Sequence, residues 1–172
     1  MTILSYKLAK MVKEANPEQT HSLAIMQYSI EILLNTLSII IISSIMGWFI
    51  GELASTLIVL LSIMVLRLLS GGAHMPTMGG CIVVSVSLCV GIPLIPPVGN
   101  DIVWLMTAFS TLFVLLFAPS PERNSNMPPM WVPYFKILSI LVVCSNFAIE
   151  SQIIGWAFLV QAITIIPWKG GS

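Results

Sequence analysis

Between Arg67 and Cys81 the chain reads R-L-L-S-G-G-A-H-M-P-T-M-G-G-C, a glycine-rich break that separates two long apolar segments. Gly71-Gly72, Pro76 and Gly79-Gly80 all oppose a continuous helix here, because glycine weakens a helix and proline interrupts its hydrogen bonds. We therefore predict a helix on each side of the break and a re-entrant turn between them.

The composition around this break is that of a membrane protein. Of 172 residues, 57% are hydrophobic and 8% are charged, whereas a soluble globular domain has about 25% charged residues. A spanning helix requires about 20 apolar residues, so the chain has room for about six crossings and no separate soluble domain. The fold class predicted is an all-α, polytopic integral membrane protein. The net charge of zero indicates no general attraction to nucleic acid.

Six apolar runs are long enough to serve as spans and are separated by short polar or glycine-containing breaks. We predict spans at Tyr28–Ile50, Leu53–Leu69, Cys81–Val98, Ile102–Phe117, Tyr134–Ile149 and Ile153–Pro167. Together they form a single helical bundle over residues 28–167, with a loop over residues 70–81. Pro93, Pro96 and Pro97 should make the third span kink or end early, because each removes a backbone donor.

The distribution of charge predicts an orientation. With the N-terminus in the cytoplasm, all seven Lys and Arg residues lie at or near the inner face of the membrane. The three opposite turns then carry only Glu52, Asp101 and Glu150. Because basic residues favour cytoplasmic loops, both chain ends and the 70–81 loop are predicted to be cytoplasmic.

Residues 1–24 predict an amphipathic helix that lies in the membrane surface. Apolar side chains share one arc of a helical wheel and lysines occupy the other side, which is typical of a helix that binds an anionic lipid surface. The apolar arc contains Leu4, Leu8, Met11 and Ala15, and the lysines are Lys7, Lys10 and Lys13. We expect no cleaved secretory signal here.

His74 and Cys81, seven residues apart, are the two side chains that a thiol nucleophile and its base require. The unpaired amides at a helix N-terminus favour a thiolate at Cys81, and a nearby imidazolium adds to this effect. The same amides could bind an oxyanion when a carbonyl is attacked. No acidic residue lies close in sequence to orient His74, so Glu31, at a similar membrane depth, is our candidate unless the site is a dyad.

Other interpretations of these residues stay open at this stage. A lone cysteine in a membrane helix is usually a packing residue, as we expect for Cys89 and Cys144. Met75 and Met78 flank the pair, and thioether, imidazole and thiolate together suit a soft ion such as Cu(I). We expect no disulfide.

A small transporter or channel is the alternative from another functional class. Glu31 and Asn35, four residues apart in the first span, could line a polar path together with the broken third span.

The block from Arg67 to Cys81, with S-G-G-A-H before the loop, resembles the accessory gene regulator B (AgrB) family of bacterial membrane endopeptidases. Three further segments resemble family positions, so that the likeness covers nearly the whole chain. They are Gln27-Tyr28 with Glu31, Phe117-Ala118-Pro119, and the run from Gln161 to Pro167.

This resemblance implies a cysteine endopeptidase for quorum sensing that needs no metal or cofactor. Cys81 would attack a peptide bond of a small precursor, His74 would transfer the proton, and the acyl group would pass to a precursor cysteine to form a thiolactone, or to a serine to form a lactone. The precursor is expected to carry an amphipathic N-terminal helix and an acidic tail. A homodimer in the lipid bilayer is favoured by the small size of the chain.

Arg67, Gly71, Gly72 and Arg123 are the remaining expected substrate-binding or orienting residues. The family typically has a lysine-rich second cytoplasmic loop, whereas this chain has Glu122, a single Arg123 and then an Asn/Ser/Pro-rich stretch. This departure predicts a precursor with a less acidic tail, or a helix register that brings Arg67, Arg123 and Lys136 together.

Overall fold

The computed structural model describes residues 2–15, 22–72, 77–120 and 128–166. These residues form helices joined by short connections, with no strand among them. The helices are α1 (Thr2–Ala15), α2 (Leu23–Ile50), α3 (Leu53–Ser70), α4 (Met78–Gly91), η1 (Ile92–Leu94), α5 (Asn100–Phe117), η2 (Pro129–Trp131), α7 (Val132–Cys144), α8 (Asn146–Ile149) and α9 (Gln152–Thr164).

The predicted all-α membrane class agrees with this structure, whereas the number of six spans is not confirmed. Four segments are long and apolar enough to cross a membrane: α2, α3, α5 and the stretch Pro129–Ile149. The other two predicted spans correspond to shorter apolar helices, Gly79–Leu94 and Gln152–Thr164.

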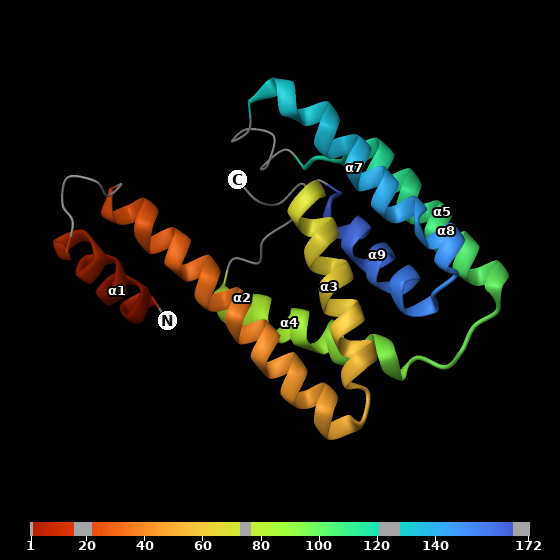
Figure 1. The fold of residues 1–172 in the computed structure, drawn as a ribbon, viewed down its shortest axis with the longest axis horizontal. Helices are drawn as coiled ribbons and strands as arrows, with labels where there is room; N and C mark the ends of the chain where they lie inside the picture. The colour runs from red at the N-terminus through yellow and green to blue at the C-terminus, as the bar shows by residue number, and fades with distance from the viewer. Residues whose placement is uncertain (1, 16–21, 73–76, 121–127, 167–172) are drawn as a thin grey trace.

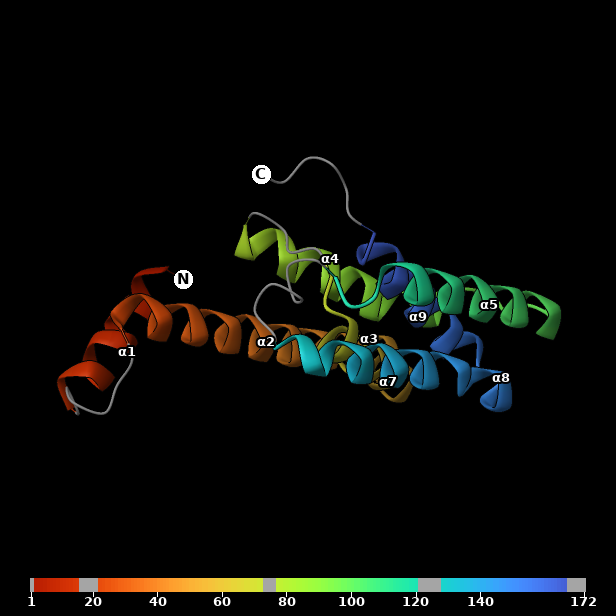
Figure 2. The same ribbon diagram turned by 90° about the horizontal axis from the view of Figure 1, so that it is seen from above.

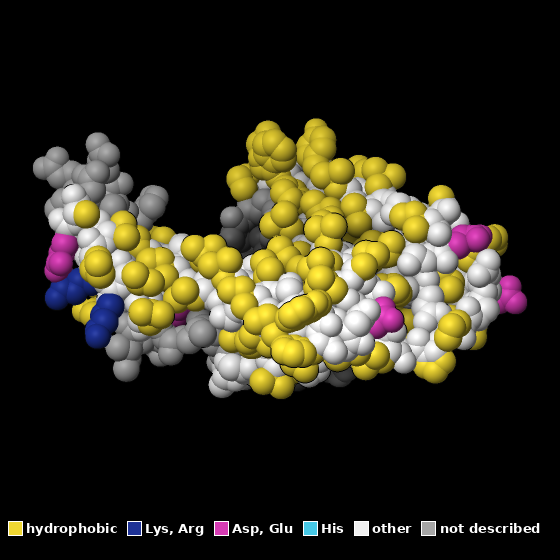
Figure 3. Space-filling view, turned by 60° about the horizontal axis from the view of Figure 1, so that its bottom comes forward, with side chains coloured by type: hydrophobic (Ala, Val, Ile, Leu, Met, Phe, Trp, Pro, Cys, Tyr) yellow, Lys and Arg dark blue, Asp and Glu magenta, His cyan; other side chains and the backbone are white. Residues whose placement is uncertain are grey.

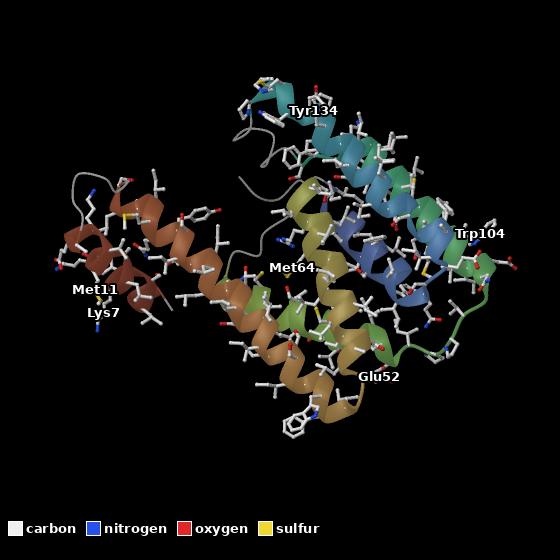
Figure 4. All side chains as sticks on the ribbon, viewed as in Figure 1. Lys7, Met11, Glu52, Met64, Trp104 and Tyr134 are labelled. Carbon is white, nitrogen blue, oxygen red and sulfur yellow. The ribbon has the colours of Figure 1, made fainter. Side chains whose placement is uncertain are left out.

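The helices form two layers, with α2, α3, α7 and α8 in one and α4, α5 and α9 in the other (Figure 2). α9 lies in the middle of Figure 1 and packs against α3 and α5, while α4 packs against α2. The α2–α3, η1–α5 and α8–α9 connections lie toward one end of the molecule (Figure 1). The C-terminal ends of α3, α5 and α9 and the N-terminal end of α7 lie toward the other. In Figure 4, Glu52 and Trp104 mark the first end and Tyr134 marks the second.

The surface and interior have the pattern expected of a protein in lipid. Large apolar side chains cover the outside, including Phe49 and Trp48 at 78% and 68% exposure. Small or polar residues lie where helices meet, because close approach of helices in a membrane depends on small side chains. At the α2–α3 hairpin a Cβ on Gly47 would lie 2.7 Å from Thr56 Oγ1, so only glycine allows these helices to approach so closely.

The third predicted span begins too late, whereas its early end is the one expected from its prolines. α4 begins at Met78, three residues before Cys81, and ends at Gly91, where the short η1 follows. Residues 95–99 are not helical, because the prolines remove the donors that would extend a helix. The side chain of Gln152 replaces these bonds: it accepts from Val98 N at 2.7 Å and donates to the carbonyl oxygens of Ile95 and Pro96, each at 3.1 Å.

The N-terminal helix is shorter than the predicted 1–24 segment, since α1 ends at Ala15 and α2 begins at Leu23. α1 packs on α2 through Ser5 and Ala9, both fully buried. The predicted apolar arc faces away from this contact, with Leu4 and Met11 more than half exposed. Figure 3 shows lysine side chains at the α1 end of the molecule and acidic side chains at the opposite end as well as beside the lysines.

Candidate functional site

Cys81 lies in the first turn of α4, at its fourth residue, and is partly buried. Thr77 is the N-cap of this helix. Its hydroxyl accepts from Gly80 N at 3.3 Å, and its carbonyl accepts from Cys81 N at 3.1 Å. The helix start is therefore well defined, and two of its first amides already have acceptors.

The side chain of Asn35, from the middle of α2, reaches the Cys81 sulfur. Asn35 Nδ2 donates to Cys81 Sγ at 3.6 Å. Asn35 Oδ1 is buried and has no hydrogen-bond partner among the described residues. Sequence reasoning placed Asn35 in a polar path and missed this contact. The signal that could have found it is a carboxamide in an otherwise apolar helix, which is costly in lipid unless it has a partner.

The turn after α3 is held in one conformation by α9. Gly71 (φ 74°) and Gly72 (φ 143°) both have positive φ, which glycine adopts without steric penalty. Gln161 Nε2, from a side chain only 1% exposed, donates to Gly71 O at 2.8 Å. A Cβ on Gly72 would lie 2.8 Å from Thr164 Oγ1. The two glycines thus direct the chain away from α3, close against the C-terminal end of α9.

The last turn of α3 is linked to the segment after α5 as well. Ser120 N donates to Ser70 O at 2.8 Å, and Ser70 Oγ donates to Leu66 O at 2.7 Å. Arg67 is partly buried in this last turn, and its carbonyl accepts from Gly71 N at 2.9 Å. Arg67 therefore lies in the last turn of α3, and its expected role in binding or orienting the substrate stays a prediction.

Glu31 lies one helical turn before Asn35 on α2, and its described hydrogen bonds come from α1 and from its own helix. Glu31 Oε1 accepts from Ser5 Oγ at 2.8 Å and from Gln27 Nε2 at 3.2 Å. Among the described residues Glu31 therefore joins the N-terminal helix to α2. Its predicted role as the group that orients His74 stays a prediction.

Several predicted site residues lie outside the described residues. They are His74, Met75 and Arg123, together with the side chain of Met78. The described part of the chain contains no group of three or more His, Cys, Asp or Glu residues that could hold a metal ion.

The described residues thus bring together a partly buried thiol and a carboxamide donor at its sulfur. The glycine turn after α3 is held separately, against the C-terminal end of α9. This arrangement can present a sulfur nucleophile at the end of the helical bundle where α3, α5 and α9 also end. The fold and the site define a helical membrane protein with a thiol held at the start of a helix.

The sequence model of the accessory gene regulator B family matches residues 5–166, so this chain belongs to that family. A relative from Halalkalibacterium halodurans, named as a putative AgrB-like protein, is 26% identical over 95% of this chain and 86% of its own length. Two Staphylococcus aureus sequences named accessory gene regulator protein B are 24% and 28% identical, covering 80% and 65% of this chain and 79% and 65% of their own lengths. No solved structure matches the chain.

Proposed function

We propose that this protein is a membrane-embedded cysteine endopeptidase that cleaves a small precursor peptide and cyclises it to a thiolactone or lactone signal for quorum sensing. The observation that carries the proposal is the position of Cys81, partly buried in the first turn of α4 with the Asn35 amide at its sulfur. Membership of the accessory gene regulator B family supports it.

In the proposed reaction the Cys81 sulfur forms a bond to the carbonyl carbon of a peptide bond near the C-terminal end of the precursor. His74 accepts the thiol proton and later gives it to the leaving amine, while the carbon–nitrogen bond breaks. The acyl group remains on Cys81 as a thioester. A cysteine thiol within the precursor then attacks this thioester, which closes the ring and releases the Cys81 thiol.

This sequence of steps has two physical requirements. Exchange of one thioester for another conserves the number of thioester bonds, so it needs no nucleotide hydrolysis. Water must also be kept from the acyl-enzyme, and a site at the membrane surface restricts its access.

The arrangement of the helices supports a site near the inner face of the membrane. α2 has 28 residues, and at 1.5 Å per residue it is about 42 Å long, whereas the hydrocarbon core is about 30 Å thick. The part of α2 before Asn35 can therefore extend toward the headgroups. With Glu52, Asp101 and Glu150 on the outer side, Cys81 and both chain termini are cytoplasmic in this proposal, as the charge distribution favours.

The direct test uses the purified protein in liposomes together with a candidate precursor, a short peptide with an amphipathic N-terminal helix and one internal cysteine. Mass spectrometry should detect a released C-terminal fragment and a product that lacks one water relative to the linear cleaved peptide. Cys81→Ala and His74→Ala should abolish both products. Cys81→Ser should still bind the precursor but not cut it, because serine lacks comparable activation.

Cys89→Ala is the matched control, since Cys89 lies on the same helix at 2% exposure, and it should retain both products. Cleavage by Cys81→Ala at the wild-type rate would refute the assigned nucleophile. A linear product alone would refute the cyclisation step while leaving the proteolysis in place.

A further inference from the structure

We infer that Asn35 supplies the oxyanion-stabilising hydrogen bond of this site, and that it is a catalytic residue rather than a packing residue of α2. The inference rests on the proposed function, because an oxyanion forms only if Cys81 attacks a carbonyl. It assigns to the carboxamide of α2 a role that the sequence had suggested for the backbone amides of α4.

The backbone amides nearest to the nucleophile are already engaged. Cys81 N donates to Thr77 O and Gly80 N donates to Thr77 Oγ1. An amide that already donates to one acceptor must weaken that hydrogen bond before it can donate to another. These two amides are therefore poorly placed to stabilise an oxyanion. A side-chain donor from a neighbouring helix can supply what these two amides do not.

The position of Asn35 Nδ2 fits this requirement. In the tetrahedral adduct the oxyanion is joined to Sγ through a single carbon, so it lies within two bonds of the sulfur. Asn35 Nδ2 is 3.6 Å from Sγ. A donor at that distance can approach the oxygen to about 2.7–3.1 Å, which is the separation that oxyanion stabilisation requires. In the resting site the weaker contact with sulfur holds the amide in place.

Only the nitrogen of the Asn35 carboxamide has a hydrogen-bond partner among the described residues. Its Oδ1 is buried and has no partner among the described residues, and the helix around it is apolar. A buried, half-satisfied carboxamide in a membrane helix is costly. This cost is offset when a substrate or the reacting atoms supply the missing hydrogen-bond partner.

The proposed oxyanion forms when Cys81 attacks the carbonyl carbon and disappears when the leaving amine departs. The Cys81 sulfur forms the carbon–sulfur bond, and the π electrons of the carbonyl move to oxygen, where Asn35 Nδ2–H donates to the new negative charge. When the adduct collapses, these electrons form the carbonyl again and the carbon–nitrogen bond breaks. The leaving amine receives its proton from His74, and Asn35 returns to the sulfur of the thioester.

The test compares two reactions of Cys81 in liposomes: acylation by the precursor peptide, and alkylation by iodoacetamide, which creates no oxyanion. Asn35→Leu, similar in size but without a donor, should slow acylation by about 10²–10³-fold and change the alkylation rate far less, since alkylation loses only the weak hydrogen bond to the sulfur. Asn35→Gln, which keeps the carboxamide, should restore part of the acylation rate. Thr36→Ala is the matched control from the same helix, since among the described residues the Thr36 hydroxyl bonds to Ile32 O, and it should change neither rate.

Each contrary outcome has a distinct meaning. Wild-type acylation by Asn35→Leu would overturn this inference and leave the proposed function intact. An equal loss of acylation and alkylation would overturn it too, because Asn35 would then be only a structural support for Cys81. Cleavage that persists in Cys81→Ala would remove the proposed function, and the inference with it.

Discussion

The first and third turns of α4 carry the same residue type in opposite environments. Cys81, in the first turn, is partly buried and has a side-chain amide at its sulfur. Cys89, two turns later, is 2% exposed and packs in a cluster with Val59, Leu60, Ile92 and Ala157. The same helix thus has an accessible thiol near its start, and a second thiol, further along, that packs in the core as a small apolar group.

The difference comes from the neighbouring helices rather than from α4 itself. Near its N-terminus α4 meets the part of α2 that carries Asn35, whereas further along it meets apolar side chains of α3 and α9. A cysteine takes the role that its surroundings allow, because reactivity depends on access and on groups that stabilise the thiolate.

The contrast between Cys81 and Cys89 is tested by measuring the reactivity of each thiol separately. In variants that retain only Cys81 or only Cys89, iodoacetamide should label Cys81 faster by on the order of a hundredfold, since labelling of Cys89 requires local opening of the core. Mass spectrometry of the intact protein gives both rates. Unfolding in detergent and denaturant should equalise them, and equal rates in the folded protein would contradict the distinction drawn between the two turns.

A smaller effect is expected from the turn that leads to the Cys81 end of α4. Gly72→Ala should be strained in two ways. The alanine would have to adopt a φ of 143°, and its Cβ would lie 2.8 Å from Thr164 Oγ1 and 3.1 Å from Gln161 Nε2. Such strain costs about 1–3 kcal/mol, and if the turn shifts to relieve it, precursor cleavage should fall about tenfold or more. The protection of Cys89 against iodoacetamide should stay the same.

Gly91→Ala is the control for this substitution, because a Cβ there meets nothing within 4 Å. It should leave both cleavage and Cys89 protection at wild-type levels. Full cleavage by Gly72→Ala would show that the turn does not control the site.

The smallest effect is expected at the contact between α1 and α2, one turn from Asn35. Ser5→Ala removes the 2.8 Å hydrogen bond to Glu31 and should lower the free energy of unfolding by about 1 kcal/mol, the usual net value of such a bond. Thermal unfolding in detergent would measure it.

Ser29→Ala is the control for Ser5→Ala, since the exposed Ser29 hydroxyl bonds, within the part of the chain that the structure describes, to Ile25 O in its own helix. Equal stability of the two variants would show that Ser5 does not fasten α1 to α2.

Much of the fold could be predicted from hydrophobicity alone, because apolar runs of this length have few stable alternatives to membrane helices. The break at Gly71-Gly72 and the early end of α4 at its prolines were predicted for the correct reasons. The start of α4 was predicted too late, because Met78 and the two glycines after it were assigned to the loop. The Thr77 cap that begins the helix was not recognised.

The site was only partly predictable. Cys81 and the glycine turn stand out in the sequence, whereas two of their partners are far away in it. Asn35 lies 46 residues from Cys81 and Gln161 lies 90 residues from Gly71. Such contacts depend on how helices cross, which the pattern within one helix does not encode.

The sequence by itself determined that this chain lies in a membrane as helices and where the chain must break, because each segment must satisfy its own backbone hydrogen bonds in lipid. It also marked the thiol in the family's glycine-rich block. Only the tertiary structure decided that the carboxamide of α2 meets this thiol, that Glu31 bonds to α1, and that α9 holds the turn. These pairings arise from the packing of small side chains between helices, which is a property of the assembled bundle and not of any one segment.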